Sequence, residues 1–267
     1  LATLASGLCQ DGQLDLEVGE GWSWDPARRV LTVDRADLER RGSAYCAGIV
    51  AHEVGHVLIS RYLSFPVSFV SQRAGMTMLN GIEDPRVETW IVGRFPGAAA
   101  WLAAGRGEAH PSAKIGSRFI TFCLECAAEG ERDYAPTPEP LPASVREALE
   151  VTRDARRRYS QTTPATDLSA TEANLRARYI DEVQPHLSGP PWPPSRREQA
   201  VRLWAWRAHA LAAAEILPVA ERLFLSDRDR LARHLRRNPD AAARARSQLG
   251  QGPKGGAGGA PWSGLGR

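Results

Sequence analysis

The pattern of hydrophobic and polar positions divides the chain into a short region of strands and a much longer region of helices. Apolar residues alternate with polar ones in 14–18, and two short apolar runs, 22–24 and 30–33, flank a turn-forming segment at 25–28. Alternation with a period of two residues is typical of strands that bury one face. This part of the sequence therefore predicts a small antiparallel sheet.

Two helices are predicted after the sheet. The run 44–63 follows Ser43, a candidate N-cap, contains no proline, and has Glu53 and Arg61 as its acidic and basic residues. Such a composition is typical of a largely buried helix. The second helix is predicted at 76–94, where Pro85 must occupy a first helical position or kink the helix.

The rest of the pattern is helical. Further helices are predicted near residues 117–130, 143–159, 171–186, 196–224 and 227–248. Pro-rich segments at 136–140 and 189–194 have the composition of stiff connectors. We expect an α+β, mostly helical chain with a first domain at 1–135, a helical subdomain at 141–248 and a flexible Gly-rich tail or linker at 249–267.

Composition narrows the classes of partner. With 267 residues and 43% hydrophobic content, the chain can bury a sizeable core. Its 34 basic and 31 acidic residues give a net charge of +3, too balanced to predict nucleic acid or a membrane surface as a partner. The most apolar helical stretch is interrupted by Glu215, so no membrane span is predicted and we expect a cytoplasmic protein. The C-x-x-C pair Cys123 and Cys126 lies in an apolar run and is expected in the core.

The first predicted helix contains the candidate metal-binding residues. Residues four apart in a helix share a face, so His52 and His56 can present two imidazole nitrogens to one zinc ion, with Glu53 within reach of its water. The alternative is a helix whose histidines are satisfied by core hydrogen bonds, with Glu53 as a cap or paired with Arg61. That arrangement is disfavoured because two buried histidines and a buried carboxylate without a metal have a large desolvation cost.

A catalytic zinc ion usually takes a third protein ligand. The metzincin pattern is excluded because Ile59 and Tyr62 stand where it needs Gly and His. Glu83 is the expected third ligand. Asp84 and Glu88, four apart on one helical face, are expected to support the imidazoles, although either can take the place of Glu83. The alternative for all three acids is a solvated acidic helix start.

These motifs resemble those of known metalloproteins over residues 43–95. The His52 to His56 helix followed by a Glu resembles the gluzincin metallopeptidases. The second motif departs from the thermolysin type, because Val87 stands where an acid is found four residues after the ligand. That segment instead resembles the E-D-x-R-x-E stretch of zincin-like regions that accompany von Willebrand A domains in cobaltochelatase-type proteins.

The resemblance implies a zinc metallopeptidase that hydrolyses a peptide or protein substrate through a metal-activated water, with Glu53 as general base. Gluzincins commonly bring a Tyr or His from a later helix to the oxyanion, which makes Tyr179 and His186 candidates and leaves Tyr159 and His110 open. The second resemblance implies an alternative: a metal-binding regulatory or assembly module without useful proteolysis. In that case the Gly-rich tail would lead to a von Willebrand A type partner domain.

Overall fold

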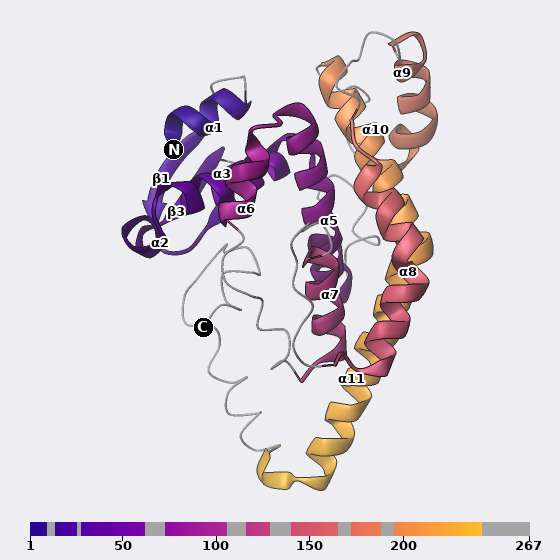
Figure 1. The fold of residues 1–267 in the computed structure, drawn as a ribbon. Helices are drawn as coiled ribbons and strands as arrows, with labels where there is room; N and C mark the ends of the chain where they lie inside the picture. The colour runs from indigo at the N-terminus through magenta and orange to yellow at the C-terminus, as the bar shows by residue number, and fades with distance from the viewer. Residues whose placement is uncertain are drawn as a thin grey trace.

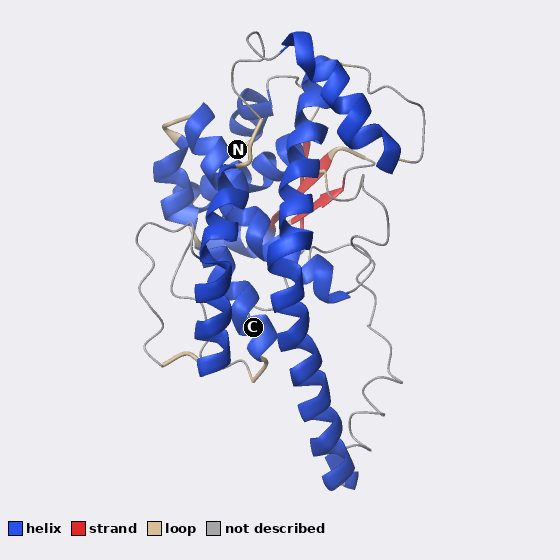
Figure 2. Ribbon diagram, turned by 90° about the vertical axis from the view of Figure 1, so that its right-hand side faces the viewer, coloured by secondary structure: helices blue, strands red, loops and turns tan. Residues whose placement is uncertain are grey.

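The fold begins with a helix and a small sheet. The structure is a computed structural model that describes residues 1–9, 14–25, 28–61, 73–105, 116–128, 140–164, 172–187 and 195–241. Helix α1 (Ala2–Cys9) precedes strands β1 (Asp15–Gly19), β2 (Ser23–Asp25) and β3 (Val30–Asp34), which pair in the order β1-β3-β2. The expected mostly helical fold with a small N-terminal sheet is confirmed (Figure 2).

The sheet is mixed rather than wholly antiparallel. Strand β3 is central and pairs in parallel with β1, with Leu16 opposite Leu31, and antiparallel with β2, with Trp24 opposite Leu31. Leu31 and Val33 on one face of β3 are buried, but Val30 on the other face is buried too and Val18 of β1 is exposed, so the expected burial of one face holds only in part. The alternation of apolar residues specifies which face is buried but not the direction of the neighbouring strand.

Helices form the rest of the described chain (Figure 1). They are α2 (Arg35–Arg40), α3 (Ser43–Ile59), α5 (Arg73–Arg94), α6 (Ala98–Gly105), α7 (Arg118–Ala128), α8 (Ala143–Gln161), α9 (Glu172–Arg178), α10 (Arg196–Leu211) and α11 (Leu217–Arg237). Short π and 3-10 turns, η3 (Tyr179–Val183) and η4 (Gln184–His186), extend α9, and η5 (Ala212–Ile216) joins α10 to α11. The expected break between helices at 196–224 and 227–248 is therefore wrong: α10, η5 and α11 run without interruption from Arg196 to Arg237, and residues 242–248 lie outside the described ranges.

Helix α5 lies between the two largest apolar clusters. Its residues Met78, Leu79 and Ile82 pack with α7, α8 and α11, whereas Val87 and Ile91 pack with α1, α3, α6 and the sheet. Figure 1 shows α5 in this central position. Because α5 is shared, it fixes α3 relative to the later helices; the expected domain division at residues 135–141 stays a prediction.

A pair of glycines lets α3 and α6 cross closely. A Cβ atom on Gly48 would lie 2.0 Å from the backbone oxygen of Trp101, and one on Gly105 would lie 2.9 Å from the Cα of Gly48. No larger residue fits at either glycine without moving the backbone. The close contact with α6 therefore depends on both glycines and fixes the buried side of α3.

Candidate metal site

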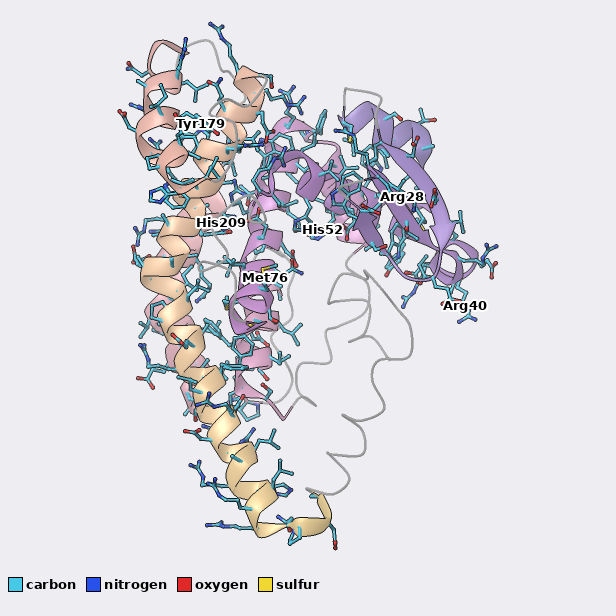
Figure 3. All side chains as sticks on the ribbon, turned by 180° about the vertical axis from the view of Figure 1, so that it is seen from behind. Arg28, Arg40, His52, Met76, Tyr179 and His209 are labelled. Atoms are coloured by element: carbon cyan, nitrogen blue, oxygen red, sulfur yellow. The ribbon has the colours of Figure 1, made fainter. Side chains whose placement is uncertain are left out.

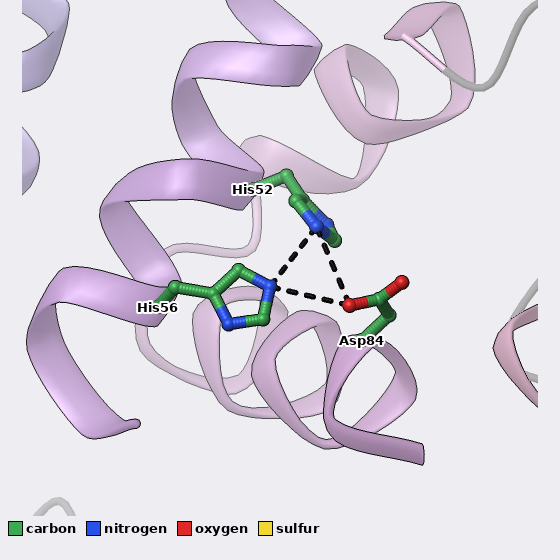
Figure 4. A group of neighbouring side chains, drawn as sticks. All are labelled: His52, His56 and Asp84. Atoms are coloured by element: carbon green, nitrogen blue, oxygen red, sulfur yellow. Dashed lines mark hydrogen bonds and ion pairs between the residues drawn. The ribbon is translucent and has the colours of Figure 1, made fainter. Parts of the chain in front are cut away.

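Helix α3 buries one face and leaves the motif residues at its edge. Val50, Ala51 and Val54 are fully buried, whereas His52 and His56 are partly exposed, with 21% and 14% of their side chains accessible. The helix therefore packs firmly on one side and presents both imidazoles toward α5 on the other (Figures 3 and 4).

Gly55 sets the distance between α3 and α5. A Cβ atom at this position would lie 2.3 Å from Cγ1 of Val87, well inside ordinary van der Waals contact. The missing side chain lets the two helices approach where the histidines face α5. Gly55 is therefore part of the reason that residues on α5 reach the imidazoles.

Three donor atoms from α3 and α5 converge. Nε2 of His56 lies 3.1 Å from Nε2 of His52 and 3.2 Å from Oδ1 of Asp84, and Nε2 of His52 lies 3.7 Å from the same oxygen (Figure 4). Zinc–ligand bonds of about 2.0–2.2 Å in a tetrahedral arrangement separate neighbouring ligand atoms by roughly 3.3–3.6 Å. The observed spacing fits an ion held by these three residues, which form a candidate metal-binding group among the described residues.

The second nitrogen of each imidazole is also engaged. Nδ1 of His52 lies 3.3 Å from Oε1 of Glu88, and Nδ1 of His56 lies 3.0 Å from the hydroxyl of Ser60. Both rings therefore turn Nε2 toward Asp84 and Nδ1 toward a separate partner. This is the usual arrangement of metal-ligating histidines, in which an outer hydrogen bond orients the ring.

The charges around His52 favour a cation. Burial opposes protonation of its imidazole, but the hydrogen bond to Glu88 and the charges of Asp84, Glu88 and Glu53 outweigh burial and raise the pKa of His52 to about 10. An environment that holds a proton this strongly also attracts a divalent metal ion, which must displace that proton.

Glu83, the expected ligand, lies elsewhere. Its side chain is fully buried; Oε1 accepts hydrogen bonds from Ser60 and Arg86, each at 2.6 Å, and Oε2 accepts one from the Tyr159 hydroxyl at 2.6 Å. Burial opposes ionisation, but the nearby charge of Arg86 and these hydrogen bonds outweigh it and lower the pKa of Glu83.

The structure thus brings Asp84, and not Glu83, to the two histidines. Successive helical residues point about 100° apart, so one acid on α5 can face α3 while its neighbour faces α8. Asp84 and Glu88 share the face toward α3, with the same four-residue spacing as the histidines. That matched spacing is the signal in the sequence that favours Asp84.

The remaining expected site residues are dispersed. Glu53 is partly buried beside His52. Tyr179 is buried in a separate apolar cluster of η3, α9 and α10, and the exposed His186 stacks on Trp206 with ring centroids 4.2 Å apart. In Figure 3, Tyr179 lies among those helices, apart from His52. Neither belongs to the metal-binding group, and His110 lies outside the described residues.

Two more side chains lie in the buried surroundings of the site: Tyr159, left open above as a residue for the oxyanion, and His209, which no motif predicted. Tyr159 donates to Glu83, and its hydroxyl lies 3.0 Å from Nδ1 of His209 on α10. Sequence spacing gives no signal for these contacts, because the three residues are 50 or more positions apart. They depend on how α8 and α10 pack against α5.

Other expectations concern the cysteines and the membrane. Cys123 and Cys126 are buried thiols in the core, as expected, with the Cys123 sulfur 3.6 Å from the sulfur of Met78. None of the helices in the described ranges has the length and apolar character needed to cross a membrane.

Comparisons with models of known protein families, with curated proteins and with solved structures found no match to this chain. The resemblance to gluzincins therefore rests on the motif residues alone, whereas the structure shows a possible metal-binding group of His52, His56 and Asp84 in which Asp84 takes the place expected for a Glu.

Proposed function

We propose that the chain is a zinc-dependent hydrolase of peptide bonds, with the ion held by His52, His56 and Asp84 and with Glu53 as general base. The observation that carries the proposal is the convergence of two imidazole nitrogens and one carboxylate oxygen beside a glutamate. Three protein ligands with a fourth position left for solvent are typical of catalytic zinc sites, whereas structural sites usually have four.

The donor set favours zinc among the divalent ions. Magnesium and calcium prefer oxygen ligands, whereas two imidazoles and one carboxylate suit zinc and related transition metals. When bound, zinc would supply Lewis-acid chemistry that polarises a carbonyl group and makes water more acidic. The outer contacts of His52 with Glu88 and of His56 with Ser60 would keep both rings aimed at the ion.

Glu53 supplies the proton transfer in this proposal. It follows His52 directly and is close enough for its charge to stabilise the protonated imidazole. Its carboxylate would accept a proton from the attacking water and return it to the leaving amine. Arg61, the other charged residue expected in this helix, binds Glu198 on α10 through both carboxylate oxygens, so it does not neutralise Glu53.

The test compares Glu53→Gln with wild type on a broad peptide library in the presence of zinc. Loss of a general base typically costs about 10²–10⁴-fold in rate. We expect hydrolysis to fall by at least 100-fold while zinc content stays unchanged, because the amide that replaces the Glu53 carboxylate could not accept the proton. The matched control is Glu39→Gln on the exposed side of α2, which should cleave like wild type.

Equal rates for Glu53→Gln and wild type, with zinc retained in both, would refute the role of Glu53. Zinc binding by wild type without cleavage of any peptide would refute peptidase activity and favour the metal-binding regulatory module.

A further inference from the structure

We propose that Glu83 is a positioning residue that selects the metal-binding tautomer of His56 through the hydroxyl of Ser60. The inference rests on the metal-binding part of the proposed function. A neutral imidazole carries its proton on one nitrogen, and only the other nitrogen can bind a metal ion. The contact at Nδ1 of His56 therefore decides whether Nε2 is available.

The direction of the hydrogen bonds follows from counting protons. Ser60 has one hydroxyl proton, and its Oγ lies 2.6 Å from Glu83 and 3.0 Å from Nδ1 of His56. An ionised carboxylate can only accept, so the hydroxyl proton points to Glu83. Ser60 must then accept from Nδ1–H of His56. This leaves the lone pair on Nε2, the nitrogen that faces His52 and Asp84.

Glu83 accepts these protons only when it is ionised, and its surroundings favour the ionised form. Arg86 lies one turn away on α5, and both side chains are fully buried with Nη1 and Oε1 2.6 Å apart. The guanidinium is itself held by a hydrogen bond from its Nε to the backbone oxygen of Thr162, 2.7 Å away at the end of α8. A fixed, permanently charged partner keeps the buried carboxylate in its accepting form.

The direction of the hydrogen bonds that link Glu83 to α8 and α10 follows from the same count of protons. The Tyr159 hydroxyl donates its proton to Oε2 of Glu83, so its oxygen accepts from Nδ1–H of His209. Two chains of hydrogen bonds therefore end at Glu83. One begins at His56 and the other begins at His209. The helices of the later half of the chain thereby hold in place the carboxylate that orients a ligand on α3.

His52 has an outer partner of its own. Its Nδ1 faces Glu88 directly, and no atom of the Ser60–Glu83 pair contacts it in the described hydrogen bonds. A change at Ser60 should therefore alter His56 and leave the contact between His52 and Glu88 in place.

The experiment uses Ser60→Ala, with Ser60→Thr as the conservative variant that restores a hydroxyl. In metal-free protein with ¹⁵N-labelled histidine, we expect the NMR signals of wild type to place the neutral-form proton of His56 on Nδ1. Ser60→Ala should lose this preference and Ser60→Thr should restore it. Zinc affinity, measured by competition with a chelator, should fall about 10–100-fold in Ser60→Ala, the usual cost of losing an outer-shell partner.

Two further variants separate positioning from stability. Thr152→Val removes another buried hydroxyl, which donates to the backbone oxygen of Ala148 on α8, and should leave zinc affinity within twofold of wild type. Glu83→Gln presents an amide that can donate to Ser60 and reverse the bond; where it folds, it should shift the His56 proton to Nε2.

An unchanged His56 tautomer and unchanged zinc affinity in Ser60→Ala would overturn the positioning role while leaving the proposed function intact. Failure of wild type to bind zinc would overturn the proposed function, whereas the tautomer measurement on metal-free protein would still decide the role of Ser60 and Glu83.

Discussion

Gly55→Ala tests whether the close approach of α3 and α5 builds the metal site. The added Cβ atom would lie 2.3 Å from Cγ1 of Val87 and 3.4 Å from Cδ1 of Ile91. Ordinary carbon contacts are about 3.5–4.0 Å, so the helices must separate locally by roughly 1 Å. Val87 cannot easily turn away, because it is fully buried and its β-branched side chain has few rotamers.

The expected loss of stability is modest. Overpacking of this kind costs about 1–3 kcal/mol, and replacing Gly by Ala in a helix returns about 1 kcal/mol. The net destabilisation should therefore be about 1 kcal/mol. The effect on zinc should be larger, because a shift of about 1 Å in Asp84, one turn before Val87, exceeds the roughly 0.2 Å tolerance of a metal–ligand bond.

Gly93→Ala is the matched control. Gly93 lies in the same helix as Val87 and is exposed, and a Cβ atom there would meet nothing within 4 Å. This change should stabilise the protein by about 0.5–1 kcal/mol and leave zinc binding unchanged. Urea unfolding of the metal-free proteins gives the stabilities, and chelator competition gives the affinities.

We expect Gly55→Ala to bind zinc at least tenfold more weakly than either wild type or Gly93→Ala. If Gly55→Ala instead bound zinc like wild type and gained as much stability as Gly93→Ala, the geometry proposed for α3 and α5 would be wrong.

Two other predictions concern pH and stability, measured by urea unfolding of metal-free protein. Burial opposes ionisation of Glu198, but hydrogen bonds from Arg61 and Arg202 and the charges of both arginines outweigh burial and lower the pKa of Glu198. The stability that ionised Glu198 adds to the folded protein is therefore present above its unfolded-state pKa. It is lost as the pH falls through the folded-state pKa. Glu198→Gln should cost roughly 1 kcal/mol at pH 7 and much less at pH 3, and an equal loss at both pH values would contradict an ionic contribution. Burial lowers the pKa of His209 to about 4, so wild type should lose about 1.4 kcal/mol per pH unit from this group between pH 6.5 and 4. His209→Asn should weaken that dependence, and an unchanged slope would show that His209 is not buried in its neutral form.

The sequence predicts the helices well where one pattern dominates. Helix α3 lies where the apolar run predicts it, but Gly42 rather than Ser43 is its N-cap, no side chain caps it, and it ends at Ile59. Helix α5 ends at the expected Arg94. Pro85 lies inside α5 rather than at its start, because packing on both sides of the helix outweighs the local cost of a proline. The direction of β1 relative to β3 was not predictable, since alternation carries no information about strand direction.

The candidate site also contains some residues that the sequence predicts and others that it does not. His52, His56 and Glu53 are recognisable because their spacing within one helix already specifies their geometry. Which of the three neighbouring acids faces the histidines depends on how α5 is rotated about its axis. Gly55 and the apolar clusters determine that rotation. The paths from Glu83 to Tyr159 and His209 depend on contacts between distant segments, for which this single sequence shows no pattern.

Zinc titration of the metal-free protein is the most direct test of the site formed by His52, His56 and Asp84. Wild type should bind close to one equivalent, His52→Ala and His56→Ala should bind none tightly, and Asp84→Ala should lose most of the affinity. Thr152→Val, altered away from the donor atoms, should titrate like wild type. Wild-type protein that takes up no zinc, or an Asp84→Ala variant with wild-type affinity, would contradict the assignment of these three ligands.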